Sequence, residues 1–582
     1  MSPLDWIVVL GYLAGTLWLG LYLAGKGSQS LNEYFLGGRA IPWWLAGGSM
    51  AATTFNVDTP LYVAGLVARR GIAGNWEWWC FAGAHVLMQV ILGPLWRRAE
   101  VMTDAELIER RYSGRAAALL RGTRAFFFGI PLNCIAIGYG MLAMRKVMVA
   151  LDVTAVFHLP GDQQLWSVSL IVVLTLVYAA ASGLWGVVWT DFFQLVLKMI
   201  GALLVAGYAL AEVHGLSGLR AQLVATGHGD ALRMVPRAGD AALPMSTFGA
   251  YLLLQWWTYR GADGGGMFVQ RLSSVGSERE AEKASILFNV INYVVRTWPW
   301  IVVALAALVV LPPLADPEIA YPLMMKRYLP PGILGLVFAS LVAALMSAVS
   351  TQINWGASYA VRDLYQRFVN REAPQEKLVL VARGATVLIT LLAATASFYM
   401  DDVGKVFRFM VLFGNGTGMV LLLRWFWWRI NAWAEWSALI AGTTIAIALT
   451  AVPGLSSLGF GMKIMISAVG TAAVWIPVMF LTAPEPDAML DAFYARARPG
   501  GPGWARFAVR TGVAAVQPLG RALGEVVAVL AMVLGAMLAI GGVVIGSAAW
   551  MAGATAAALL GYVLRKSVRA PLQPVRPDSS IP

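Results

Sequence analysis

Charge is scarce in this sequence, since Asp, Glu, Lys and Arg make up only 13% of the 582 residues. A soluble domain carries about 25% charged residues. The chain has two cysteines and four histidines, with no CxxC and no HExxH motif. The sequence therefore predicts no disulfide framework, no zinc site, no cofactor and no enzymatic activity.

Apolar residues are abundant instead, at 59% of the chain, and they fall in long runs. A run of about 20 apolar residues can cross a bilayer as a helix, whereas long runs exclude a β-barrel. The first run has no basic residues before it, so a membrane helix is expected there and not a cleaved signal peptide. An all-α integral membrane protein is predicted, with about fifteen membrane helices, near 3–24, 41–66, 73–95, 117–150, 165–182, 184–211, 247–273, 284–313, 331–361, 376–399, 404–428, 432–454, 463–482, 522–543 and 546–565.

The net charge of +12 comes from Lys and Arg that cluster between the apolar runs. In a soluble protein such a charge would suggest nucleic acid, but here cytoplasmic loops explain it, so no nucleic-acid partner is expected. The N-terminus is then predicted outside and the C-terminus inside, in the cell inner membrane. Arg69 and Arg70 break this rule. The basic side carries Lys26, Arg39, Arg97, Arg98, Arg110, Arg111, Arg115, Arg362, Arg367, Arg371, Lys377, Arg424, Arg429, Arg496, Arg498, Arg506, Arg510, Arg565, Lys566 and Arg569.

Two of the predicted helices are interrupted. The helix 41–66 contains the polar stretch 53–60, which ends in a proline, and the helix 247–273 contains the glycine-rich stretch 260–266. Backbone groups freed at membrane depth are tolerated only where they are buried in protein or line a cavity. Broken helices at corresponding places in two halves indicate a transporter site. Because four apolar spans follow each break, an inverted five-plus-five repeat is predicted, although each break could be a simple kink.

This reading divides the chain into seven segments. They are an extra N-terminal helix and cytoplasmic loop (1–40), the first five-helix repeat (41–211), an external loop (212–246), the second repeat (247–430), two further helices (431–482), a basic cytoplasmic linker (483–521) and two C-terminal helices with the tail (522–582).

Several short motifs resemble the sodium:solute symporter family, which includes sodium/glucose, proline, pantothenate and sialic acid symporters. They follow the family's order and spacing from about residue 3 to 430. The resemblance implies the inverted five-plus-five repeat with an extra N-terminal helix, and sodium as the coupling ion. The motifs are NEYFLGGR at 32–39, IPWW at 41–44, TDAELIERRY at 103–112, VWTD at 188–191, VQR at 269–271, AALMS at 343–347 and RDLY at 362–365.

Polar residues recur at helical spacing along 344–358, which can join helices together or hold a cation. The resemblance implies a conserved sodium site at Ala52, Phe55, Ala344 and Ser347. Relatives usually carry a second hydroxyl beside Ser347, where this chain has Ala348. A second sodium site, found in some family members, would use Asp191, Ser347, Ser350 and Thr351.

Charges near the two breaks predict the solute site, because an ionisable residue inside a membrane helix needs a partner or a function. Arg presents a bidentate fork suited to a carboxylate or to hydroxyls. Internal ion pairs, of Arg296 with Glu77 or of Arg260 with Asp263, are the alternative. The predicted solute contacts are Asp58, Thr59, Glu77, Trp257, Arg260, Asp263 and Arg296.

These features predict a sodium-coupled symporter that moves a small polar solute, such as a sugar, sugar acid, amino acid or organic acid, by alternating access. Its partners would be the solute, sodium ions and the lipid bilayer. Proton coupling through Asp191, Glu77 or Asp58 is an alternative, motivated by Ala348. A transporter-like solute sensor is another. The sequence sets neither the solute nor the oligomeric state.

Overall fold

The computed structural model describes residues 1–24, 37–101, 103–154, 162–179 and 184–569. The first part of the predicted loop after 24, which holds Lys26 and most of the motif at 32–39, lies outside the described residues. Every regular element within the described ranges is helical, which confirms the all-α class. Ten of these helices are long and apolar enough to cross a membrane, or up to eleven if α22 and α23, bent by 45°, form one span.

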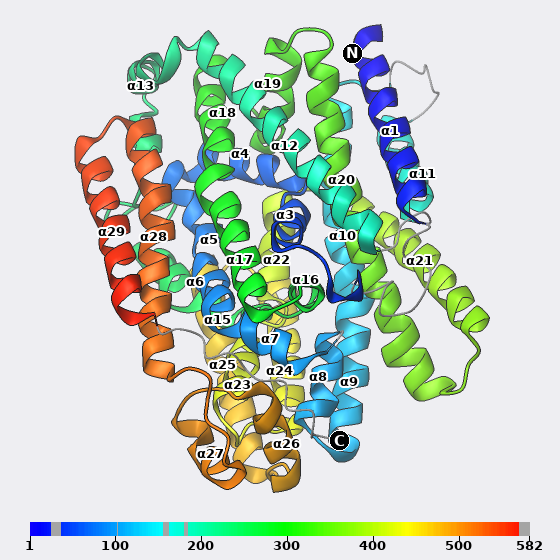
Figure 1. Ribbon diagram of the computed structural model, residues 1–582. Coiled ribbons are helices and arrows are strands. Elements are labelled where there is room, and N and C mark those ends of the chain that lie inside the picture. Colours follow the sequence, from blue (N-terminus) through cyan, green and yellow to red (C-terminus); the bar gives the residue numbers. More distant parts are fainter. Residues whose placement is uncertain (25–36, 102, 155–161, 180–183, 570–582) are drawn as a thin grey trace.

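The helices of the first half surround the first break (Figure 1). They are α1 (Pro3–Ala24), α3 (Trp43–Thr54), α4 (Asp58–Arg70), α5 (Trp76–Trp79), α6 (Ala82–Leu87), α7 (Gly93–Ala99), α8 (Asp104–Arg111), α9 (Gly114–Gly129), α10 (Pro131–Ala150), α11 (Gln163–Ala179), α12 (Leu184–Glu212) and α13 (Gly215–Ala225). Shorter turns are η1 (Gly37–Arg39), η2 (Ile72–Asn75), η3 (Met88–Leu92) and η5 (Gly229–Leu232).

The later helices complete the bundle. They are α14 (Met245–Ala250), α15 (Trp256–Thr258), α16 (Met267–Ser274), α17 (Glu278–Asn289), α18 (Thr297–Val310), α19 (Ala320–Tyr328), α20 (Ile333–Ser358), α21 (Gln375–Phe398), α22 (Val403–Leu412), α23 (Thr417–Phe426), α24 (Ala432–Ala451), α25 (Phe460–Leu481), α26 (Asp487–Ala497), α27 (Ala505–Thr511), α28 (Leu519–Ile545) and α29 (Ala548–Val568). Shorter turns are η6 (Tyr251–Gln255), η7 (Val290–Val295), η8 (Pro317–Ile319), η9 (Tyr359–Val369) and η10 (Pro502–Trp504).

Helix α20 lies at the centre of the bundle and is buried along most of its length. It packs against α3 and α12, which also pack against each other, so these three helices meet in one place. Helix α1 lies against both α12 and α20. Its Asp5 is buried, and the carboxylate accepts the backbone N–H groups of Gly332 at 2.7 Å and Gly335 at 2.8 Å. These two hydrogen bonds satisfy free N–H donors at the start of α20 and attach α1 to it.

The last two helices, α28 and α29, form a hairpin at one edge of the bundle (Figure 1). Two arginines of its final turns, Arg565 and Arg569, bind Glu282 on α17 at 2.6 and 2.8 Å. Arg565 also binds Glu525 on α28 at 3.0 Å. The hairpin is therefore attached to α17 through charge as well as apolar packing.

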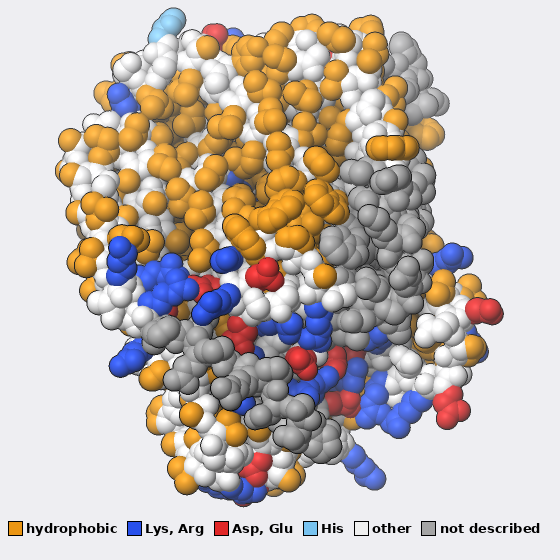
Figure 2. Space-filling model, viewed as in Figure 1, with side chains coloured by type: hydrophobic (Ala, Val, Ile, Leu, Met, Phe, Trp, Pro, Cys, Tyr) orange, Lys and Arg blue, Asp and Glu red, His pale blue; other side chains and the backbone are white. Residues whose placement is uncertain are grey.

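Charged side chains are unevenly distributed on the surface. Figure 2 shows one face that is mostly apolar in its upper part and carries a belt of Lys, Arg, Asp and Glu in its lower third. Helices α8, α9, α26 and α27 lie in that lower part of the molecule, whereas α13 and α19 lie at the top (Figure 1). This asymmetry is what a bilayer-spanning protein with one basic side requires.

Candidate functional site

The first predicted interruption is present in the structure. Helix α3 ends at Thr54 and α4 begins at Asp58. The N–H of Phe55 donates to the carbonyls of both Ala51 and Ala52, each at 3.1 Å. Those carbonyls belong to a helix end, so they retain capacity to accept further donors.

The second interruption separates α15 from α16. The chain leaves helical geometry at Tyr259 and resumes it at Met267. Gly264 and Gly266 have φ values of +75° and +72°, which glycine adopts far more readily than other residues. The glycine run is thus what allows the helix to open here.

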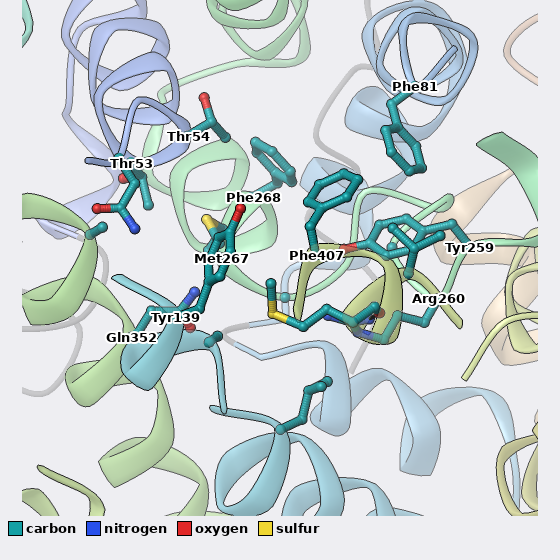
Figure 3. A pocket seen from close by; sticks show the side chains of 18 of the residues that line it. Thr53, Thr54, Phe81, Tyr139, Tyr259, Arg260, Met267, Phe268, Gln352 and Phe407 are labelled. Carbon is teal, nitrogen blue, oxygen red and sulfur yellow. Dashed lines mark hydrogen bonds between the residues drawn. The ribbon is translucent and has the colours of Figure 1, made fainter. Parts of the chain in front are cut away.

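A cavity of about 360 Å³ lies between the two breaks. Figure 3 shows Thr53 and Gln352 on one side of it, with Tyr259 and Arg260 on the opposite side. Its wall combines hydroxyl, amide, charged and aromatic groups, among them Tyr139. A cavity with a few polar groups among aromatic ones is the usual form of a small-molecule site.

Four of the seven predicted solute contacts line this cavity: Asp58, Thr59, Arg260 and Arg296. Sequence reasoning did not select Thr53, Thr54, His85, Asn292 or Gln352, which also line it. Thr53 and Thr54 belong to the polar stretch 53–60 that marked the first break, whereas nothing in the spacing of His85, Asn292 or Gln352 singled them out.

Arg296 is the most informative of the lining residues. It is 3% exposed, and its Nη1 donates to the Ala51 carbonyl and the Thr54 hydroxyl, both at 3.2 Å. Its Nε has no hydrogen-bond partner among the described residues. The guanidinium therefore binds the end of α3 through Nη1, while its Nε donor is left without a described partner.

Glu77 lies outside the described lining of the cavity and has other partners. Its carboxylate binds Arg408 at 2.7 and 3.1 Å and Arg70 at 2.7 Å. The hydroxyls of Tyr62 and Tyr251 each donate to it at 2.9 Å. The predicted pairing with Arg296 is absent among these contacts of the described chain.

The cluster around Glu77 also explains why Arg69 and Arg70 do not follow the predicted distribution of basic residues between the two sides of the membrane. Arg70 is committed to Glu77, and its neighbour Arg69 binds Asp402 at 3.1 Å. Arg408 lies within the predicted helix 404–428, and an arginine in a membrane helix was the signal that could have found it.

Asp263 and Trp257 also lie outside the described lining. Asp263 binds Arg424 at 2.6 Å, and Arg424 in turn binds Glu435 at 3.2 Å. Arg260 instead donates to the backbone carbonyls of Met410 and Phe413. The alternative pairing of Arg260 with Asp263 is therefore not the arrangement found, and Asp263 belongs to a buried charge network below the second break.

The residues predicted to bind sodium converge on one region. Ala344, Ser347, Ser350 and Thr351 lie on α20 and are all buried. Asp191 on α12 is fully buried and accepts the hydroxyl of Ser347 at 2.5 Å. It also accepts the hydroxyl of Ser49 on α3 at 2.6 Å.

Two basic side chains enter the same region. The ammonium of Lys198 donates to the Ala52 carbonyl at 3.0 Å. Arg271 donates to the Thr351 hydroxyl at 3.2 Å and lies 3.8 Å from Asp191. The motif at 269–271 includes Arg271, but sequence reasoning placed neither Lys198 nor Arg271 at an ion site.

A profile of the sodium:solute symporter family matches residues 34–442, which is more than half of the chain. The chain belongs to the sodium:solute symporter family. This confirms the prediction of a sodium-coupled symporter made from the motifs. The family match covers both breaks and the whole of α20.

Known relatives of the symporter are distant. It is 24% identical over 491 residues to the sodium/glucose cotransporter of Vibrio parahaemolyticus, covering 78% of this chain and 86% of the relative. It is 25% identical to the sodium/myo-inositol cotransporter 2 of Oryctolagus cuniculus over 488 residues, covering 76% and 69%. A Na⁺-coupled sialic acid symporter, solved in a substrate-bound outward-open state, shares the fold with a TM-score of 0.66 at 21% identity. That alignment covers 83% of this chain and 99% of the other.

Proposed function

We propose that this symporter carries a small solute rich in hydroxyl groups, or a carboxylate such as a sugar acid, in the cavity between the two breaks. The observation that carries the proposal is Arg296, which lines the cavity, is buried, and keeps Nε without a described partner. Asp58 and Gln352, which also line the cavity, supply acceptors. The volume lies within the range of small-molecule sites. Sugars and sugar acids offer both the donors and the acceptors that such a wall can pair.

We assign sodium to the region between α12 and α20. Asp191 with Ser347, Ser350 and Thr351 offers a carboxylate and three hydroxyls, the hard oxygen ligands that small cations prefer. The conserved site implied by the resemblance adjoins it: Ala344 and Ser347 lie on α20, whereas Ala52 and Phe55 lie at the end of α3. For sodium to reach Thr351 and Asp191, Arg271 has to withdraw from them.

Transport is proposed to proceed by alternating access, with segments 41–211 and 247–430 as inverted repeats within about fifteen membrane helices. The charged belt of Figure 2 supports a cytoplasmic position for the lower side, hence an external N-terminus and a cytoplasmic C-terminal end in the cell inner membrane. In this orientation the cluster of Arg408, Arg70 and Glu77 joins α4, α5 and α22 on the external side of the cavity. We take it as the outer closure.

Uptake by proteoliposomes tests the proposal. Labelled glucose, myo-inositol and sialic acid are the first solutes to try, because relatives or fold neighbours are named for them. At least one hydroxyl-rich solute should accumulate with an inward sodium gradient and fail to do so when choline replaces sodium. Uptake that persists in choline but collapses without a pH gradient would favour proton coupling. Specific binding without uptake would favour a sensor.

A further inference from the structure

Lys198 projects into the place where the family resemblance puts the conserved sodium ion. It lies on α12 seven residues after Asp191, which is two helical turns, so both side chains leave the same face. It is 1% exposed, and Nζ lies 3.0 Å from the Ala52 carbonyl, a predicted sodium ligand. Its ammonium also lies over the ring of Phe55, 5.7 Å from the centroid.

The register of α12 against α20 places Lys198 level with the other predicted ligands. Asp191 accepts the hydroxyl of Ser347. One turn beyond Lys198, Gly201 faces Ser340, whose hydroxyl would lie 2.5 Å from a Cβ added at that glycine. The two helices therefore run antiparallel, and Lys198 falls between these contacts. On α20 the stretch between Ser340 and Ser347 contains Ala344, another of the predicted ligands.

The same site lacks an oxygen that relatives supply. Ala348 stands where family members usually have a second hydroxyl, and it lines the solute cavity. A sodium ion that lacks this oxygen ligand binds more weakly, whereas the Lys198 ammonium needs only hydrogen-bond acceptors around it. The absent hydroxyl and the presence of Lys198 both favour an ammonium over a sodium ion at this site.

The charged groups around Lys198 disfavour a second cation beside its ammonium. Asp191 on its own helix is the carboxylate that acts on it, and Arg296 from the turn before α18 adds a further positive charge. Arg271 on α16 already lies 3.8 Å from Asp191. Two cations about 4 Å apart repel strongly where the dielectric is low. Sodium and the Lys198 ammonium therefore exclude each other at the Ala52 carbonyl.

We propose that the Lys198 ammonium is a tethered cation that replaces sodium at the conserved site, so that sodium binds this chain only at the Asp191 site. The inference rests on the proposed function, because it assumes the two sodium sites assigned there. It makes residue 198 the determinant of sodium stoichiometry. The solute would then be coupled to one sodium fewer than in a relative that fills both sites.

Equilibrium binding of radioactive sodium to the purified protein tests this, with choline chloride holding ionic strength constant. Wild type should bind one sodium per chain. Lys198→Met, which keeps length and removes charge, should bind one more. Adding Ala348→Ser to Lys198→Met should tighten the new site about fivefold, as expected for one neutral hydroxyl ligand. Ala348→Ser alone should leave sodium binding unchanged, because the ammonium still fills the site.

Three comparisons decide the result. Lys405→Met, at an exposed lysine paired with Asp401, is the matched control and should bind as wild type does. Equal stoichiometry in wild type and folded Lys198→Met would overturn the proposal, as would tightening by Ala348→Ser alone. The latter needs no Lys198 variant, so the test holds even if that variant does not fold.

The failure of the proposed function is distinguishable from failure of this inference. Asp191→Asn should abolish the single sodium of wild type. If wild type binds no sodium but Lys198→Met gains one, the Asp191 site is wrong and the role of Lys198 stands. If wild type binds two, one of them insensitive to Asp191→Asn, sodium coupling stands and the tethered cation is refuted.

Discussion

Arg408 binds Glu77 through two hydrogen bonds, from Nε to Oε1 at 2.7 Å and from Nη2 to Oε2 at 3.1 Å. The bond joins α22 to α5, and the hydroxyls of Tyr62 on α4 and Tyr251 on η6 complete it. Residues of both broken-helix regions, Tyr62 and Tyr251, thus donate to the Glu77 carboxylate. Because we propose this cluster as the outer closure, we expect Glu77 to exchange partners when the cavity opens outward.

Removing this bond should favour the outward-open state. Breaking a buried ion pair costs about 3–5 kcal/mol, and we expect the lower end for Arg408→Met because Arg70 still compensates Glu77. A cysteine at Ala136, which lines the cavity, should then react at least tenfold faster with an impermeant thiol reagent added outside.

The background for that labelling replaces the two native cysteines, Cys80 and Cys134, which are both buried. Lys405→Met on the same helix is the control, since its side chain is exposed. An unchanged labelling rate in folded Arg408→Met would show that the cluster is not the outer closure.

Ser347→Ala should impair sodium binding more than Ser358→Ala. The Ser347 hydroxyl donates to the Asp191 carboxylate, whereas that of Ser358 donates to the Trp355 carbonyl within its own helix. One lost neutral ligand is worth about 1 kcal/mol, so the half-saturating sodium concentration should rise about fivefold in Ser347→Ala alone. Sodium titration of thermal stability measures it, and equal values in both variants would count against the site.

Arg296→Lys should weaken solute binding while the protein still folds. Lysine keeps the charge but loses the planar fork, and with it the free Nε. Loss of a charge-assisted hydrogen bond is worth about 1.5–3 kcal/mol, or roughly ten- to hundredfold in apparent affinity. The ligand-dependent rise in melting temperature reports it. Arg145→Lys is the control, because Arg145 donates to the Met400 carbonyl and lies outside the described cavity lining. Normal binding by Arg296→Lys would give the arginine a structural role.

Arg424→Met should destabilise the fold and leave no functional protein. Arg424 is 0% exposed and compensates two buried carboxylates, Asp263 and Glu435. Removing one partner of a buried ion pair costs about 3–5 kcal/mol. Thermal unfolding in detergent should show a large fall in melting temperature. Arg429→Met, at an arginine bound to the Thr482 carbonyl, should change it little. If Arg424→Met were as stable as wild type, Asp263 would again be a candidate for solute contact.

The class of fold and both helix breaks could be predicted from the sequence, because length, hydropathy and the runs at 53–60 and 260–266 are local signals. The ion-pair partners of individual charged residues could not be predicted from the sequence. Glu77 and Asp263 were visible as costly charges, but Arg408 and Arg424, which bind them, lie more than 150 residues away in sequence; only Arg70 is a local ion-pair partner of Glu77 among the described contacts. Which arginine reaches which carboxylate depends on how the two halves pack, and no local pattern records that.

The residues predicted to bind sodium were easier to group from the sequence than the residues that line the cavity, for a related reason. The residues 344–351 share one helix, so their spacing alone puts the hydroxyls together. The cavity wall draws single residues from many helices, such as Tyr139 and Gln352. Such residues carry no periodicity that marks them.

The bond from Asp5 to the start of α20 has a practical consequence. Because the carboxylate accepts two backbone N–H groups of that buried helix, any tilt of α20 has to carry α1 with it. Ile7, two residues further along, is 66% exposed. A spectroscopic probe attached there would follow the movement of the ion-binding helix from the periphery, with no label in the permeation pathway.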